Sequence, residues 1–339
     1  MPIKPAVESL MGMRMSSIDD GAASQGHLRH FPVSFFASVM GMGGLAIAFQ
    51  RAAHAVPELG VVSAVLLGVA STAFLVFAAL YTIKLMQYRD EVHHEFSHPV
   101  RLHFFPTISI ALLLLSIAFF PLDEKIARIL FLIAAPLHLL FTLTVLDQWV
   151  HRDSFQVPHL NPAWFIPIVG NLVVPIAAVP LGYADIGWFY FAIGIVFWPP
   201  ILAIIIYRML FHHPLPERMA PTLFILIAPP AVGFLAYMRL TGSLDAFARI
   251  LYFFALFLVL FLATQAPRLM RLNFYLSWWA YSFPMAAITI ASYVMFEKSG
   301  ALAYLAISHS LLAITSVIVA GLAVRTAIGV SRHELCLPE

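Results

Sequence analysis

The chain has 339 residues, of which 61% are hydrophobic and 11% are charged, and its mean hydropathy is +0.90. Soluble domains carry about 25% charged residues, so this composition excludes a soluble globular protein and indicates a protein that crosses a membrane several times. The formal net charge of +2 is too small to indicate a nucleic-acid partner. A single cysteine, Cys336, excludes a disulfide scaffold and a cysteine-ligated metal site.

The chain divides into three parts. Residues 1–30 are polar and lack an apolar core followed by a cleavage site, so we expect a flexible cytoplasmic leader and not a signal peptide. A membrane domain over 31–328 and a cytoplasmic tail over 329–339 follow. A spanning helix needs about 20 apolar residues. Ten segments of the membrane domain meet this requirement: 32–50, 61–83, 102–120, 126–146, 163–181, 186–207, 220–238, 246–264, 274–296 and 301–324.

These dense apolar runs do not alternate as membrane β-strands do, so the sequence predicts an all-α integral membrane protein with ten transmembrane helices. An even number of spans places both termini on one side of the membrane. Thirteen of the nineteen Lys and Arg residues fall on that side. By the positive-inside rule both termini are expected in the cytoplasm, with the protein in the plasma membrane, the inner membrane of a bacterium.

A proline recurs near the start of each odd-numbered segment, at intervals of 55 to 74 residues. This interval is close to one helical hairpin, and proline inside a helix kinks it. We therefore predict five hairpins, each pairing a proline-kinked helix with a straighter one. The alternative is that membrane helices simply contain proline often. The prolines concerned are Pro32, Pro106, Pro167, Pro229, Pro230 and Pro284.

The same segments carry small and polar residues that are candidates for lining a pore, although for any single one of them close helix packing is the more common role. Almost no Asp, Glu, Lys or Arg lies well inside a predicted span, which disfavours an ion-coupled pump. An uncharged pore would rely on hydroxyls, on backbone N–H groups at kinks and on positive helix ends, all of which attract anions. The candidates are Ser34, Ala37, Ser38, Gly41, Thr107, Gly170, Asn171, Gly233 and Ala287.

Phe283, directly before Pro284, is a candidate plug for such a pore, and the alternative is an ordinary core aromatic residue. Histidines at 93, 94, 98, 103, 212 and 213 raise the alternative of a metal enzyme. Their spacing is loose, and no phosphate-binding loop or nucleophile motif accompanies them. We therefore expect no catalytic residues, no metal site and no cofactor.

Four stretches of the chain resemble the tellurite-resistance/dicarboxylate transporter family, which includes bacterial TehA and the slow-type anion channels of plant guard cells. They are Phe-Pro and the residues up to Gly41 over 31–41, Glu-Val-His-His-Glu-Phe-Ser-His-Pro-Val-Arg over 91–101, Asn-Pro-Ala-Trp-Phe-Ile-Pro over 161–167, and Trp-Trp-Ala-Tyr-Ser-Phe over 278–283. The resemblance runs from about residue 31 to the last span, and it leaves the leader out.

The resemblance implies five hairpins with quasi-five-fold symmetry around a central pore, with the proline-kinked helices inside, and it implies a homotrimer. It also implies that Phe283 on the ninth helix occludes the pore and that Ala37 on the first helix faces its ring. The chain departs from the family pattern at Pro284, where related sequences often have glycine.

We therefore expect a passive channel for small anions, such as chloride and nitrate, with Phe283 as its gate. The alternative is a proton-coupled exporter of C4-dicarboxylates, or of tellurite or sulfite, from the same family. The expected partners are the anions, membrane lipid and two further copies of the chain, with no nucleic acid.

Overall fold

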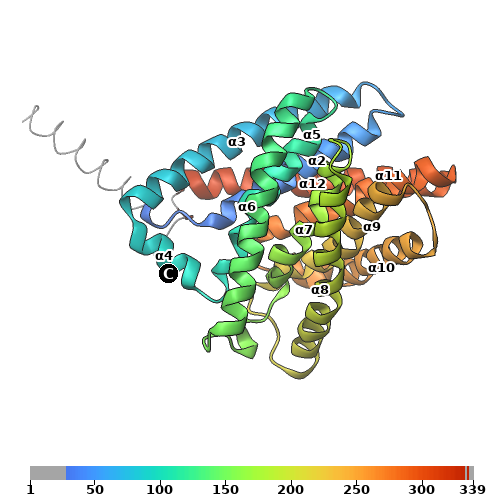
Figure 1. Cartoon of the computed structure of the whole chain (residues 1–339). Helices are drawn as coiled ribbons and strands as arrows, with labels where there is room; N and C mark the ends of the chain where they lie inside the picture. Colours follow the sequence, from blue (N-terminus) through green and yellow to red (C-terminus); the bar gives the residue numbers. More distant parts are fainter. Residues whose placement is uncertain (1–27, 333, 336–339) are drawn as a thin grey trace, which may run out of the picture.

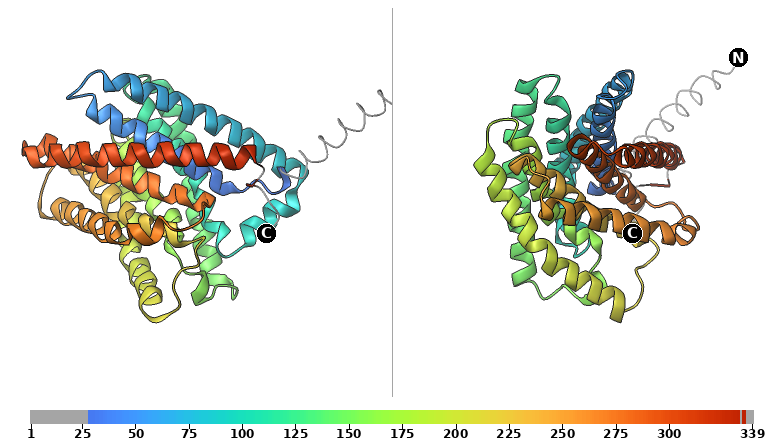
Figure 2. Two further views of the ribbon diagram at one scale, coloured as in Figure 1. Left: turned by 180° about the vertical axis from the view of Figure 1, so that it is seen from behind. Right: turned by 90° about the vertical axis from the view of Figure 1, so that its right-hand side faces the viewer.

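The computed structural model describes residues 28–332, 334 and 335. In this part of the chain there are eleven α-helices and six short 3₁₀ segments, and no strand (Figures 1 and 2). The prediction of an all-helical protein is therefore confirmed. Most of the expected leader (1–27), Cys336 and the last residues of the expected tail lie outside the described residues.

Ten of the α-helices form five consecutive hairpins, and the first helix of each hairpin lies inside the bundle. The inner helices are α2 (Phe36–Ala52), α5 (Pro106–Phe119), α7 (Ile166–Ala178), α9 (Ala228–Thr241) and α11 (Ser282–Ser299). The outer helices are α3 (Leu59–Gln87), α6 (Glu124–His151), α8 (Ala184–Phe211), α10 (Ala246–Leu269) and α12 (Leu302–Ser331).

The inner helices form a closed ring in which α2 contacts α5, α5 contacts α7, α7 contacts α9, α9 contacts α11, and α11 returns to α2. Burial separates the two sets of helices. In the inner spans long enough to cross a membrane, 72% to 83% of the residues in the most apolar stretch are buried, against 17% to 33% in the outer spans. The outer helices therefore present their apolar side chains outwards, as a lipid environment requires.

Nine helical spans in the described chain are long and apolar enough to cross a membrane, whereas the sequence predicts ten. The exception is the expected segment 163–181, where the helical part is limited to the 17 residues Pro162–Ala178. It is shorter because it consists of a 3₁₀ turn, Pro162–Phe165, followed by the 13-residue helix α7.

The six prolines singled out in the sequence lie at the starts of the inner spans and not in the interiors of their α-helices. Each inner span begins with a 3₁₀ segment that passes into the α-helix: Val33–Phe35, Arg101–Phe104, Pro162–Phe165, Ala220–Ile227 or Leu276–Tyr281. Pro106, Pro167, Pro229, Pro230 and Pro284 occupy the first turns of α5, α7, α9 and α11, and Pro32 precedes the first 3₁₀ segment. Proline fits there because the first N–H groups of a helix have no acceptor within it.

Prolines in helix interiors occur mainly in the outer helices, although the sequence predicts these to be the straighter helices of the hairpins. They are Pro136 in α6, Pro199 and Pro200 in α8, and Pro267 in α10, while Pro175 in α7 is the inner example.

A buried ion pair fastens the short helix α4 (Arg89–Ser97) to the start of the first inner span. Lys84 Nζ lies 2.7 Å from Glu95 Oε2, and both side chains are 4% exposed. Glu95 Oε1 accepts a hydrogen bond from the backbone N–H of Val33 at 2.8 Å, and Lys84 donates to the carbonyl of Phe31 at 2.8 Å. Both charges are therefore hydrogen-bonded, which a buried pair requires.

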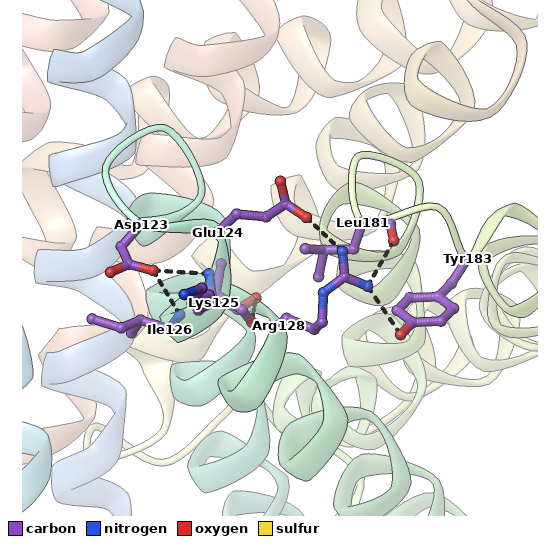
Figure 3. A network of polar contacts seen from close by, with 9 residues as sticks. Asp123, Glu124, Lys125, Ile126, Arg128, Leu181 and Tyr183 are labelled. Atoms are coloured by element: carbon purple, nitrogen blue, oxygen red, sulfur yellow. Dashed lines mark hydrogen bonds and ion pairs between the residues drawn. The ribbon is translucent and has the colours of Figure 1, made fainter.

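A second network joins the second and third hairpins at the opposite end of the bundle (Figure 3). Asp123 caps α6 by accepting from the N–H groups of Lys125 and Ile126 at 2.8 and 3.1 Å. One turn later, Arg128 pairs with Glu124 and donates to the Leu181 carbonyl and the Tyr183 hydroxyl, at 3.2 and 3.1 Å. The turn between α7 and α8 is thereby held against the start of α6.

Replacing Glu95 by Gln is expected to destabilise the protein, because Lys84 would remain buried without its counter-charge. Loss of one partner of a buried pair costs about 3–5 kcal/mol. The measurement is thermal unfolding of the purified protein in detergent. The matched control is Glu91→Gln, which removes the exposed ion pair with Arg29 and should cost less than about 1 kcal/mol. Equal destabilisation by the two variants would contradict the prediction.

Candidate functional site

Two cavities lie inside the ring of inner helices, one towards each end of it. The cavity near the N-terminal ends of the inner helices has a volume of about 640 Å³ and includes residues of the 3₁₀ segments in its wall. The cavity near their C-terminal ends has a volume of about 420 Å³. We call them the N-terminal cavity and the C-terminal cavity.

Each inner helix contributes one stripe of side chains, spaced three or four residues apart, that runs from one cavity into the other. This spacing keeps the residues on one face of a helix, so five faces converge on a common axis. The stripes include Ala37, Met40, Gly44, Ile47 and Arg51 on α2; Thr107, Ile110, Leu114 and Ile117 on α5; Ile166, Val169, Val173 and Ile176 on α7; Ala228, Val232, Leu235 and Arg239 on α9; and Phe283, Ala287, Ile290, Val294 and Glu297 on α11.

Among the residues that the structure describes, only Phe283 and Val173 line both cavities. Phe283 is half-buried, although its neighbours Ser282 and Pro284 are buried. Its ring packs beside Gly44 of α2, where an added Cβ would lie 3.5 Å from Phe283 Cδ2 and 3.0 Å from the Cβ of Ala286. Phe283 and Val173 therefore mark the level at which the two cavities meet, and this level is apolar.

About half of the candidate residues from the sequence line a cavity. Pro32, Ser34, Ala37, Thr107, Gly170 and Pro284 line the N-terminal cavity, Ala287 lines the C-terminal cavity, and Phe283 lines both. Sequence reasoning missed Val173 and Gly44. The three- and four-residue spacing of the stripes is the signal that could have found them.

The other candidates are absent from the walls of both cavities: Ser38, Gly41, Pro106, Pro167, Asn171, Pro229, Pro230 and Gly233. Asn171 instead donates to Thr142 Oγ1 at 3.1 Å and to the carbonyl of Pro167 at 2.9 Å, which joins α7 to α6. Gly41 allows close packing, because a Cβ there would lie 2.1 Å from Ser282 Oγ.

Hydroxyl groups of the inner spans bond mostly to their own helices. Ser38 donates to the Phe35 carbonyl at 2.7 Å, and Thr107, which does line the N-terminal cavity, donates to the Phe104 carbonyl at 2.5 Å. Such protons are already engaged, so a passing solute would meet an oxygen lone pair at Thr107 and not a donor.

The N-terminal cavity has charged groups at its rim, of which four form two ion pairs. Glu95 pairs with Lys84, as described above. Glu91 accepts from Arg29 Nε at 2.7 Å and from Arg29 Nη2, and this guanidinium holds the pKa of the Glu91 carboxyl below its usual range. The Glu91 carboxylate is therefore ionised at neutral pH and offsets the charge of Arg29.

The C-terminal cavity has a different balance of charged side chains, with more cations than anions in its wall. Arg51, Arg239, Lys298 and Glu297 all line it, as does His54. Between these groups and the rim of the N-terminal cavity, the stripes carry no Asp, Glu, Lys or Arg. The axis of the ring is therefore apolar in the middle and charged at both ends.

Two of the histidines that suggest a metal site, His98 and His103, have other contacts. His98 Nδ1 accepts from the N–H of Val100 at 3.1 Å, and His103 Nε2 accepts from Trp149 Nε1 at 2.9 Å while its ring stacks on Trp164. Within residues 28–332, 334 and 335, no group of three or more His, Cys, Asp or Glu side chains is placed to hold a metal ion.

A family model described as "Voltage-dependent anion channel" (SLAC1) matches residues 30–327. The chain is 28% identical over 300 residues to an uncharacterised transporter of Methanocaldococcus jannaschii, covering 81% of this chain and 88% of the transporter. It is 29% identical over 264 residues to the tellurite resistance protein TehA homolog of Haemophilus influenzae, covering 76% of this chain and 79% of the homolog. It is 28% identical over 273 residues to the S-type anion channel SLAH2 of Arabidopsis thaliana, covering 78% of this chain and 52% of the plant channel.

Replacing Gly41 by Ala is expected to destabilise the protein, because the new Cβ would overlap Ser282 Oγ and Cβ, at 2.1 and 2.6 Å. Overpacking of this kind costs about 1–3 kcal/mol. The control is Gly43→Ala on the same helix, whose Cβ would meet Leu114 Cβ at an ordinary 3.6 Å. Thermal unfolding in detergent measures both, and an unchanged midpoint for Gly41→Ala would show that the contact between α2 and α11 is not close.

Proposed function

Because the chain belongs to the SLAC1 family of voltage-dependent anion channels, we propose that it is a passive channel for small monovalent anions such as chloride and nitrate. Family membership also makes it a multi-pass membrane protein and not an enzyme. The proposed path is the axis of the ring, through the N-terminal cavity, past Phe283, and through the C-terminal cavity.

One observation carries this proposal: Phe283 and Val173 line both cavities, and no other residue within 28–332, 334 and 335 does so. A benzyl group and an isopropyl group at one level of a narrow path leave water and ions without hydrogen-bonding partners. An ion that loses its hydration there faces a steep barrier, because burying an unpaired charge is very unfavourable. Hydrophobic constrictions close channels in this way, and movement of one aromatic ring would open the path.

The apolar middle of the path supports passive flow. An ion-coupled transporter needs ionisable groups within the membrane to bind the coupling ion. Here the charged wall residues stand at the ends of the path, and the hydroxyl of Thr107 is engaged by a backbone carbonyl. The wall is therefore suited to weak, brief contacts with a permeating ion, as conduction requires.

We propose ten membrane spans, counting Pro162–Ala178 as the fifth. Four residues in 3₁₀ form and thirteen in α-helical form extend about 28 Å, close to the hydrocarbon thickness of about 30 Å. The ring of five inner helices supports a quasi-five-fold arrangement around the path. The excess of Lys and Arg on one side supports cytoplasmic termini in the plasma membrane. The homotrimer and the contact of Ala37 with the Phe283 ring rest on the resemblance alone.

The second candidate is a coupled exporter of oxyanions or C4-dicarboxylates. The name of the Haemophilus influenzae relative, a tellurite resistance protein homolog, favours keeping it. Uptake into vesicles that depends on an imposed pH gradient would support it. Currents that persist at equal pH on both sides would support the channel.

Replacing Phe283 by Ala is expected to increase the anion current several-fold, because the ring no longer separates the two cavities. The measurement is voltage clamp of the protein in planar bilayers with symmetric chloride, repeated with nitrate. The control is Ile290→Ala on the same helix, which removes apolar bulk from the C-terminal cavity alone and should leave the current near the wild-type level. An unchanged current from Phe283→Ala protein that is folded and incorporated into the bilayer would contradict the proposal.

A further inference from the structure

The last positions of three stripes bring charged residues together at the end of the C-terminal cavity. Arg51 follows Gly44 and Ile47 on α2, and Arg239 follows Val232 and Leu235 on α9, at the same three- and four-residue spacing. Glu297 occupies the corresponding place on α11. All three side chains therefore belong to the helix faces that line the path.

Two of the three cations at this end have partners. Arg51 Nη1 donates to both carboxylate oxygens of Glu297, at 3.3 and 3.2 Å, and His54 Nδ1 lies 3.5 Å from the same carboxylate. Lys298 Nζ donates to the carbonyl of Gly242 at 3.1 Å. The charge of Arg51 is therefore balanced by Glu297, and Lys298 is directed to a backbone carbonyl.

Arg239 differs from both. It is exposed and lines the cavity, where the charges of Arg51 and Glu297 act on it, but within the described part of the chain its guanidinium makes no hydrogen bond and no ion pair at contact distance. A guanidinium offers five N–H donors in a fixed planar array, which suits oxyanions and halides. Within the described residues, all five donors of Arg239 are therefore available to a solute, whereas Arg51 has one nitrogen and its charge engaged by Glu297.

Basic residues in the last turn of a helix have a simpler explanation, since they offset the negative end of the helix dipole. Arg51, Arg239 and Lys298 all lie in last turns, and Lys298 does bind a carbonyl at the end of α9. Arg239 makes no such contact. The five inner helices direct their carbonyl ends to this side of the ring, and the negative ends of their dipoles repel anions there. An anion entering the cavity from this side therefore needs a nearby cation to offset that repulsion.

We propose that Arg239 is an anion-binding group of the C-terminal cavity, which holds a small inorganic anion such as chloride or nitrate beside the path before it reaches Phe283. The inference rests on the proposed function, because it gives the permeation path its anion entry site. Binding is weak and brief, so that the anion is concentrated at this end without being trapped.

The test compares Arg239→Gln with Arg249→Gln, both in the conducting Phe283→Ala background. Arg249 lies on α10, is exposed and lines neither cavity. At low chloride on the C-terminal side, Arg239→Gln should reduce the unitary current about fivefold, the change in local anion concentration that one unit charge produces at contact in water. The difference should shrink as salt screens the charge. Arg249→Gln should match the background at every concentration.

A second variant separates charge from structure. Arg239→Cys, combined with Cys336→Ser, leaves one thiol for modification from the C-terminal side. A thiosulfonate reagent carrying a trimethylammonium group should restore the current, and one carrying a sulfonate should reduce it further. A purely structural role for Arg239 would make both reagents act alike.

The outcomes distinguish this inference from the proposed function. If Phe283→Ala conducts but Arg239→Gln behaves as Arg249→Gln does, the entry site is wrong and the channel stands. If Phe283→Ala carries no anion current, the channel proposal fails, and diffraction then decides the site. Crystals soaked in bromide should show an anomalous peak at the Arg239 guanidinium that is lost in Arg239→Gln. Absence of a wild-type peak would overturn the inference.

Discussion

The close approach of α2 to α11 is the contact on which the ring depends, because it joins the first hairpin to the last. Glycines make it possible. A side chain at Gly41 would overlap Ser282, and one at Gly44 would press on Ala286 and lie against the Phe283 ring. The contact that closes the ring is therefore also the contact that positions Phe283 between the two cavities.

Proline has a related role in four of the five inner spans, those of α5, α7, α9 and α11. At the change from 3₁₀ to α-helix it occupies first-turn positions, where a missing N–H leaves no hydrogen bond unmade. All five inner α-helices direct their carbonyl ends towards the C-terminal cavity. Because the five inner helices point the same way, their dipoles give the two cavities different electrostatic potentials, in addition to the difference in wall residues. The surplus of basic side chains at the C-terminal end opposes the negative ends of these dipoles.

Much of the architecture could be predicted from the sequence, because apolar length and the recurrence of proline are local signals. Hairpin pairing followed from them, the resemblance to the family indicated which helices lie inside, and Phe283 was found through its neighbours. The 3₁₀ segments were missed because their side-chain pattern does not distinguish them from α-helix. The sequence therefore did not show that these prolines stand where a 3₁₀ segment passes into an α-helix.

Other features depend on contacts between distant parts of the chain. Asn171 and Gly41 have the residue types expected of a pore wall, yet their neighbours, Thr142 and Ser282, engage them in packing. Val173 is an ordinary apolar residue of a buried helix, and only the geometry of the ring places it beside Phe283. The pairing of Lys84 with Glu95 likewise needs the turn between α3 and α4 before it can be recognised.

The network around Arg128 has a consequence for biosynthesis. Its acceptors, the Leu181 carbonyl and the Tyr183 hydroxyl, lie 53 and 55 residues further along the chain. When the ribosome has completed the second hairpin, neither acceptor has yet been made, and the guanidinium has only Glu124 and water. The end of the second hairpin can therefore be anchored only after the turn of the third hairpin has been synthesised, so this contact depends on the order of translation.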